Sequence, residues 1–228
     1  MKKTLLHLLA VVISVVSVPA IAIAASNSNF TQTINTGTLV ADIADASRNS
    51  VASPAVAMTA KAFSFSCYAG GSASTGTLGT NTERLYVSNG DAADNGFTLT
   101  LAATGGATST WVNGGSTQRF DFNDPTGTTA GCSDGADTDS QAGQMTVNAS
   151  AGTLTTDCTS CTATGVSLGS SASFSQGTTD SITLINAGST STDIWRGYLT
   201  GATVSQTIPA EQAADAYSLN LTLTATAQ

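Results

Sequence analysis

The chain has 228 residues, a formal net charge of −8, 10% charged residues and 22 glycines. The acidic balance excludes nucleic acid as an expected partner, because phosphate binding needs clustered Lys and Arg. The charged fraction is far below the roughly 25% of an average domain, which disfavours amphipathic helices and favours strands and loops rich in Ser, Thr and Gly.

The N-terminus has the layout of a secretory signal peptide. Lys2 and Lys3 precede an apolar run over residues 5–18, and Ala22-Ile23-Ala24 provides an A-x-A cleavage site. We predict a signal helix over 1–24 and a flexible polar arm over 25–35. An uncleaved membrane anchor is the alternative, because the segment is long enough to span a bilayer. With cleavage, the mature chain has no membrane span and is secreted to the extracellular cell surface.

Alternation with a period of two residues dominates the rest of the chain and predicts strands. In chain order they are expected at residues 38–43, 54–67, 84–87, 97–101, 110–112, 118–122, 145–147, 151–154, 171–174, 182–185, 194–199, 204–208 and 217–227. In the second segment, one face is expected to carry Val56, Met58, Phe63, Phe65 and Cys67. Residues 70–80 and 123–144 read as loops, Asn113-Gly114-Gly115 as a hairpin turn, and 209–214 as a helical turn.

Short strands separated by turn signals are typical of an all-β fold. About ten such strands, with turns every 8–12 residues, predict a β-sandwich or jelly roll. No internal repeat and no linker divides the sequence. We therefore predict one β-sandwich domain over residues 36–228, preceded by the signal helix.

The four cysteines suit an exported protein. Cys67, Cys132, Cys158 and Cys161 form an even set, which favours disulfides in an oxidising compartment. Three pairings are open, and we favour Cys67–Cys132 with Cys158–Cys161. A redox motif or half a zinc site is the alternative for Cys158 and Cys161, but no helical pattern, second CxxC or histidine accompanies them.

The inventory of catalytic residues is poor. His7 is the only histidine and lies in the predicted signal peptide, so the mature chain would contain none. Loss of imidazole excludes Ser-His-Asp and Cys-His catalysis and His-ligated zinc. We predict that the protein is not an enzyme. A hydrolase that uses carboxylates alone is the remaining alternative.

An acidic loop is the candidate metal site. Its oxygen-bearing side chains are Asp121, Asn123, Asp124, Asp134, Asp137 and Asp139. Calcium takes six to eight hard oxygen ligands from loops, so this segment could wrap one ion, although it does not match the EF-hand pattern. A solvated acidic loop is the alternative. Calcium is the only cofactor that the sequence suggests.

Two tryptophans are candidate ligand-binding residues. Trp111 and Trp195 could stack on sugar rings, as aromatic side chains do in carbohydrate-binding modules. In a β-sandwich the alternative is that both pack in the core or at its rim.

The polar arm ahead of the first strand suggests a mode of assembly. An extended segment can add to the open sheet edge of a neighbouring molecule, with main-chain hydrogen bonds supplying affinity. The alternative is a disordered terminus without a binding role.

The C-terminal strands resemble those of WxL-type bacterial cell-surface domains. The resemblance rests on residues 204–209 (VSQTIP), on 217–225 (YSLNLTLTA), and on the G-x-L and G-F-T-L-T segments that begin at Gly37 and Gly96. Phe97 stands where that family has Trp, and the second signature Trp is missing. The final strand is also similar to those of pilin-like and camelysin/TasA-like extracellular proteins. The resemblance implies a non-catalytic domain associated with peptidoglycan.

Together these features predict a secreted, non-enzymatic structural or adhesive protein of the bacterial cell surface. Its expected partners are a cell-wall polymer or other surface proteins, including further copies of itself. The alternative function is a carbohydrate-binding module with a calcium-stabilised loop.

Overall fold

Antiparallel strands form nearly all the regular structure of the chain. The computed structural model describes residues 31–35, 37–91, 95–127, 129–135, 137, 139–192 and 194–228. Residues 35–228 form one compact unit, which contains every described strand. The preceding unit is described only over residues 31–34, which have no regular secondary structure. The predicted signal helix and most of the predicted arm lie outside the described residues.

Fifteen strands and two three-residue 3-10 turns are described. The strands are β1 (Leu39–Ala44), β2 (Ser74–Leu78), β3 (Arg84–Asn89), β4 (Phe97–Ala103), β5 (Trp111–Asn113), β6 (Arg119–Phe120), β7 (Met145–Asn148), β8 (Thr153–Thr156), β9 (Val166–Leu168), β10 (Ser171–Ser173), β11 (Ser181–Ala187), β12 (Trp195–Thr200), β13 (Ala202–Gln206), β14 (Tyr217–Ser218) and β15 (Leu221–Ala227).

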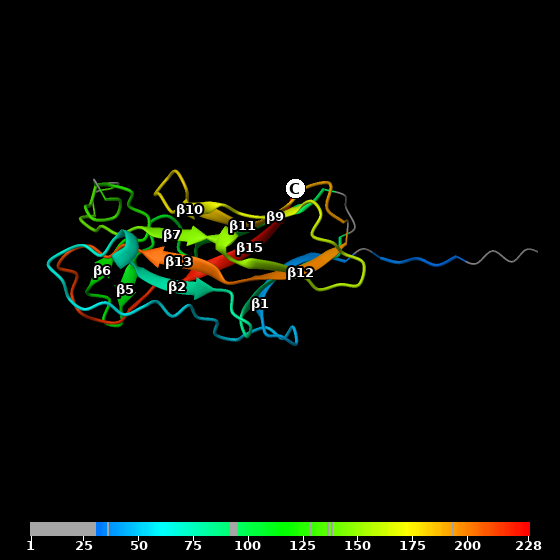
Figure 1. Ribbon diagram of the computed structural model, residues 1–228, viewed down its shortest axis with the longest axis horizontal. Coiled ribbons are helices and arrows are strands. Elements are labelled where there is room, and N and C mark those ends of the chain that lie inside the picture. Colours follow the sequence, from blue (N-terminus) through cyan, green and yellow to red (C-terminus); the bar gives the residue numbers. More distant parts are fainter. Residues whose placement is uncertain are drawn as a thin grey trace, which may run out of the picture. The chain divides into compact units, whose positions relative to one another are not determined.

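The strands form four sheets. We name them sheet 1 (β1-β3-β12-β8), sheet 2 (β10-β7-β13-β2), sheet 3 (β15-β4-β11-β9) and sheet 4 (β14-β5-β6). Figure 1 shows β5 and β6 of sheet 4 at one end of this unit and β1 and β12 toward the other. The fold is all-β and has the layers of a β-sandwich, as the alternation predicted.

Sheets 1 and 2 meet end to end across a crease. Only Gly201 separates β12 from β13, and its N–H donates to the carbonyl of Gly79 over 2.7 Å. Both glycines have a φ of +78°, a conformation that side chains with a Cβ disfavour. The two sheets therefore form one bent layer, and sheet 3 forms the opposite layer.

The core lies between the layers, because apolar and polar residues alternate along the strands and give each strand one apolar face. In β4, Phe97, Leu99, Leu101 and Ala103 are buried, while the threonines between them point outward. The largest fully buried apolar side chains are Trp195, Phe97, Phe122, Phe174, Leu85, Leu99, Met145, Ile182, Leu184, Ile185 and Leu199. They belong to one continuous cluster, so a single core supports both layers.

The outer face of sheet 3 carries rows of hydroxyl and amide side chains. Thr183, Thr100 and Thr224 lie in one cross-strand row. A second row contains Asn186, Thr98 and Thr226. The four strands of this sheet contain no ionisable residue.

Several predicted boundaries are wrong. Residues 54–67 are not a strand, although Val56 and Met58 do pack against the core. The predicted loop at 70–80 contains β2, β9 was not predicted, and the last segment is interrupted between β14 and β15. No helix is described over 209–214. The Asn113-Gly114-Gly115 hairpin is confirmed, because β5 pairs with β6.

Candidate functional site

Three carboxylates converge at one side of the acidic loop. One oxygen from each of Asp121, Asp137 and Asp139 lies within 4.8 Å of the others. Asp121 follows β6, whereas the other two residues belong to the long loop between β6 and β7. Sequence proximity alone would not join them, so the closure of the loop is what creates the cluster.

A short stretch of backbone pairing closes that loop. The N–H of Asp121 donates to the carbonyl of Ala142 and the N–H of Asp124 to that of Gly143, each over 2.9 Å. A Cβ on Gly143, whose φ is +139°, would overlap the backbone of Asp121. Glycine is needed where two backbones approach this closely. Both ends of the 125–141 segment are therefore fixed to the sandwich.

Asp121 is the buried member of the cluster, with 3% of its surface exposed. Its environment raises the pKa of its carboxyl to about 7, first through burial and then through the charges of Asp139 and Asp137. Burial, a hydrogen bond with Asp137 and the neighbouring charges also raise the pKa of Asp139. Both shifts show that negative charge is unfavourable at this point of the loop.

The other predicted ligands have different positions. Asn123 and Asp124 are buried, but Asn123 donates to the carbonyl of Ala107 and Asp124 accepts the backbone N–H groups of Thr126 and Gly135. These bonds shape the loop. Asp134 is exposed and does not belong to the three-carboxylate cluster.

Gln141 is a neighbour that the sequence analysis missed. Its amide Nε2 donates to Asp139 over 2.7 Å, and its Oε1 is buried without a hydrogen-bond partner among the described residues. Its only sequence signal was its position two residues after Asp139, just before the strand that closes the loop.

Both disulfides have the favoured pairing. Cys67–Cys132 joins the acidic loop to the segment before β2, with Cα atoms 5.7 Å apart. Cys158–Cys161 closes a local turn after β8, with Cα atoms 5.6 Å apart. The first bond anchors the middle of the acidic loop, in addition to its paired ends.

The two tryptophans occupy different environments. Trp195 is fully buried and lies 5.3 Å from Phe97 between ring centroids. That is the position of a core side chain, and its indole is not accessible to a sugar ring. Trp111 is half-buried and stacks on Phe120, and its Nε1 donates to Gln206 over 2.9 Å.

Gln206 connects Trp111 to the acidic loop. Its side chain is fully buried, and its Nε2 donates to the carbonyl of Asp121 over 2.9 Å. The same nitrogen donates to the carbonyl of Thr207, while Oε1 accepts from the indole. A buried amide with this many partners fixes the relative positions of all of them.

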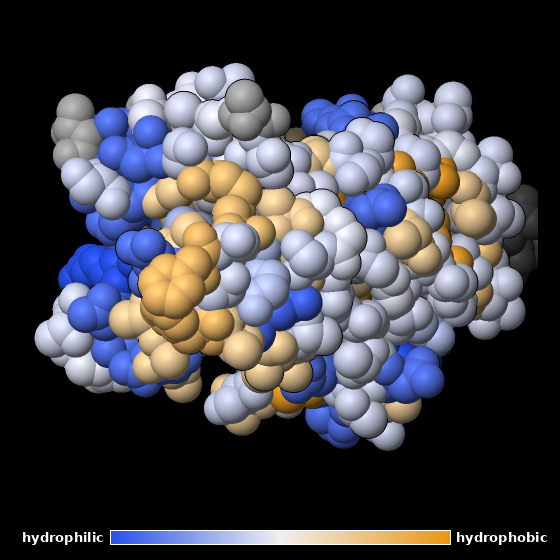
Figure 2. Space-filling model, turned by 60° about the vertical axis from the view of Figure 1, so that its left-hand side comes forward, coloured by the Kyte–Doolittle hydropathy of each residue, from blue (hydrophilic) through white to orange (hydrophobic). Residues whose placement is uncertain are grey.

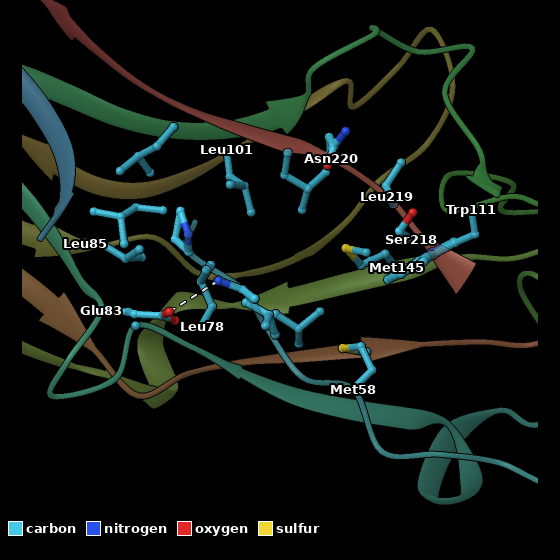
Figure 3. Close-up of a pocket in the computed structure, with 18 of the residues that line it drawn as sticks. Met58, Leu78, Glu83, Leu85, Leu101, Trp111, Met145, Ser218, Leu219 and Asn220 are labelled. Carbon is cyan, nitrogen blue, oxygen red and sulfur yellow. Dashed lines mark hydrogen bonds between the residues drawn. The ribbon is translucent and has the colours of Figure 1, made fainter. Parts of the chain in front are cut away.

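An apolar groove of about 340 Å³ opens beside β15. Leu101 of β4, Leu85 of β3, Met58 and Leu219 contribute to its lining (Figure 3). Trp111 and Met145 lie toward one end, and Glu83 accepts a long hydrogen bond from the N–H of Ala55 at the other. The groove extends between the layers and exposes apolar side chains to a ligand or a chain segment.

The strand beside this groove has an open edge. β15 pairs with β4, and no described strand pairs with its other side. Asn220 accepts from Thr104, and Gln228 donates to Gly96. Even-numbered residues of β15 therefore bond to β4, and Leu221, Leu223 and Ala225 direct their N–H and C=O groups away from it. β1 lies near part of this strand without pairing with it.

Other exposed apolar side chains are few. Figure 2 shows apolar residues gathered on one part of a face that is otherwise largely polar. The large exposed apolar side chains of the described residues are Ile34, Val40, Phe63, Phe65 and Ile194. Phe63 and Phe65 contact each other edge to face, with centroids 5.1 Å apart. We find no helical segment in the described part of the chain that could cross a bilayer.

Comparison of the chain with protein families, curated proteins and solved structures found no significant match.

Proposed function

We propose that the protein is an exported, non-enzymatic structural component of the bacterial cell surface that assembles with itself by strand addition. The observation that carries this proposal is the open edge of β15 beside the apolar groove. Unpaired strand edges are templates for another chain, and pockets for alternate side chains add specificity.

The proposed occupant is the N-terminal arm of a second copy. Phe30, Gln32 and Ile34 fall on one side of an extended chain, so two apolar side chains could enter the groove while the arm pairs with β15. The arm contains no charged residue, so it adds no repulsion to an acidic acceptor. Eleven extended residues reach about 36 Å, which exceeds the length of a seven-residue strand.

Ile34 supports this role because 88% of its surface is exposed. Burial of an exposed isoleucine is favourable by roughly 25 cal/mol for each Å² of apolar surface removed from water. The two disulfides favour an oxidising compartment, in agreement with export. The absence of histidine from the proposed mature sequence favours a role in contact rather than catalysis.

The carbohydrate-binding alternative now depends on Trp111, because Trp195 is in the core. Binding to a wall polymer, which the WxL-type resemblance implies, stays a prediction. Cosedimentation of the secreted protein with purified peptidoglycan measures it separately from self-assembly.

Sedimentation velocity of the secreted chain over a range of concentrations tests the assembly. We expect oligomers whose population grows with concentration, and fibres in negative-stain images. Ile34→Asp should abolish them because it places a charge at the apolar contact. Thr33→Asp adds the same charge on the opposite side of the arm and should have a smaller effect.

Ala225→Pro tests the acceptor edge. It removes an outward N–H that does not bond to β4, and it should therefore weaken assembly while the monomer stays folded. A wild-type protein that remains monomeric at millimolar concentration, or an Ile34→Asp variant that assembles normally, would contradict the proposal.

A further inference from the structure

We infer that Asp121, Asp137 and Asp139, together with the side-chain oxygen of Gln141, form a calcium-binding site on the loop between β6 and β7. This inference is independent of self-assembly at β15. It rests on three carboxylates that lie close together without a salt bridge, and on the buried carboxylate of Asp121, which no hydrogen bond from the described residues reaches. Asp137 and Asp139 accept N–H groups of the loop itself, from Asp139 and Gln141.

The first argument is uncompensated charge. The ion pairs of the described residues join Arg48 and Arg196 to Asp157, so no salt bridge reaches the cluster. One oxygen of each of the three carboxylates nevertheless lies within 4.8 Å of the others. Like charges at this distance repel strongly in a partly buried site, and a divalent cation converts that repulsion into attraction.

The second argument is the state of Asp121. The residue is 97% buried, no hydrogen bond from the described residues reaches its carboxylate, and its oxygen faces the other two acids. Isolated buried carboxylates are costly, and proteins compensate them by pairing or by metal coordination. Asp124 shows the contrast, since its two carboxylate oxygens accept backbone N–H groups.

Gln141 provides a further unused oxygen. Its Oε1 is buried without a partner among the described residues, while its Nε2 lies 2.7 Å from an oxygen of Asp139. Rotation of the amide by half a turn would exchange the two atoms and place Oε1 beside the carboxylates. Buried acceptors without partners are rare, and a bound ion is one of their ordinary explanations.

The chemistry of the donors favours calcium. All four candidate side chains offer oxygen, whereas zinc prefers Cys and His. Calcium accepts six to eight oxygen ligands in irregular geometry and takes backbone carbonyls and water to complete its shell. Magnesium demands a nearly ideal octahedron and loses its water reluctantly, which suits an irregular loop less well. The paired loop ends and the Cys67–Cys132 bond reduce the ordering that calcium would have to impose.

Isothermal titration calorimetry of the secreted chain, freed of metal by chelator and dialysis, tests the site. Calcium chloride should bind with a Kd of roughly 10⁻⁴ to 10⁻³ M, the range of extracellular calcium modules. Calcium should also raise the melting temperature. Asp121→Asn and Asp137→Asn should each weaken binding at least about tenfold, since each removes a charged ligand.

The variants carry an internal check of folding. Without calcium, Asp121→Asn should melt above the wild type, because the amide has the same shape without the uncompensated charge. Calcium should then stabilise the wild type more than this variant. Asp42→Asn on β1 makes the same change outside the cluster, keeps an acceptor for Ser50, and should bind calcium normally.

Three results would overturn the inference. One is the absence of both binding heat and thermal stabilisation at 10-millimolar calcium, about ten times the weakest expected Kd. Another is unchanged affinity in Asp121→Asn. The third is magnesium binding as tight as calcium binding, since the site would then lack the selectivity that its irregular oxygen donors predict.

Discussion

Asp121 shows how one residue can link the stability of the fold to its surroundings. Its backbone is fixed on both sides, by the carbonyl of Ala142 and by the side chain of Gln206. The carboxylate therefore cannot move to solvent without breaking core hydrogen bonds. The fold therefore fixes the position of the carboxylate, and only its protonation state can change.

This constraint predicts a pH dependence of stability in the presence of chelator. The pKa of Asp121 is about 7 when folded, against 3.8 for an ordinary Asp, so the folded state retains its proton longer than the unfolded state does. Below about pH 4 this carboxyl is protonated in both the folded and the unfolded state, and the free energy of unfolding is not reduced by it. As the pH rises toward 7 the carboxyl ionises in the unfolded state first, and the free energy of unfolding falls by an amount on the order of 2–4 kcal/mol. Urea unfolding between pH 4 and pH 8, the interval over which this loss develops, measures it.

Asp121→Asn should remove most of this loss, and an unchanged slope in the variant would contradict the assignment. Asp139, whose pKa is also raised, adds to the loss with the same sign. Hydrogen bonds lower the pKa of Asp45, Asp157 and Asp215, with Arg48 providing the bond to Asp157. Their stabilisation disappears only as the pH falls below about 4, so it does not mask the effect of Asp121.

Among the elements, the β12–β13 strand shapes the bent layer. It contributes to sheet 1 before Gly201 and to sheet 2 after it. The chain also passes from sheet 2 to sheet 1 through residues 79–83, between β2 and β3, and through residues 149–152, between β7 and β8. Glycine in the left-handed region allows the bend without a side-chain penalty.

Two alanine substitutions separate conformational strain from steric overlap at this crease. Gly201→Ala meets nothing closer than 3.7 Å, so it should cost about 1 kcal/mol for the left-handed backbone alone. Gly79→Ala places its Cβ 2.8 Å from the carbonyl oxygen of Leu199 and should cost roughly 2–4 kcal/mol. Urea denaturation gives both values, and equal costs would show that the crease yields to the added methyl.

The same elements show what the sequence could and could not predict. β4 was recognisable because one face is buried and the other wet, which leaves a period of two in the sequence. β2, with the sequence STGTL, was missed because Ser, Thr and Gly are equally typical of loops. Residues 54–67 alternate as a strand does, but their pairing with β2 is limited to contacts at Thr59.

The candidate site was partly predictable for a related reason. The density of acidic residues indicated the loop, but the convergence of Asp121, Asp137 and Asp139 depends on pairing between 121–124 and 142–145. Such non-local pairing leaves no periodic signal. The groove was not predictable either, because it requires that β15 be an edge strand, and edge position is a property of the whole sheet.

For the whole molecule, two covalent links act at very different ranges. Cys67–Cys132 spans 65 residues and joins the acidic loop to the segment before β2, whereas Cys158–Cys161 spans 3. A long closed loop restricts the unfolded chain more than a short one does. The long link should therefore contribute more to the stability of the sandwich.

Replacing each pair by serine tests this difference. On the chain-entropy model, Cys67→Ser/Cys132→Ser should lower the free energy of unfolding by about 4 kcal/mol and the short pair by about 2 kcal/mol. Thermal and urea unfolding of both double variants against the oxidised wild type measure the two losses. A larger loss from the short pair would show that local structure after β8, rather than loop closure, controls stability.

The hydroxyl rows on sheet 3 have a consequence for contact with the environment. Threonine has few side-chain rotamers, so the rows hold donors and acceptors at fixed spacing. Because those strands carry no titratable group, changes in acidity or salinity leave the face electrically unaltered. The strength of any adhesion through this uncharged face would therefore depend little on pH or salt concentration. Contact through the acidic loop would depend on both, because its carboxylates titrate and are screened by salt.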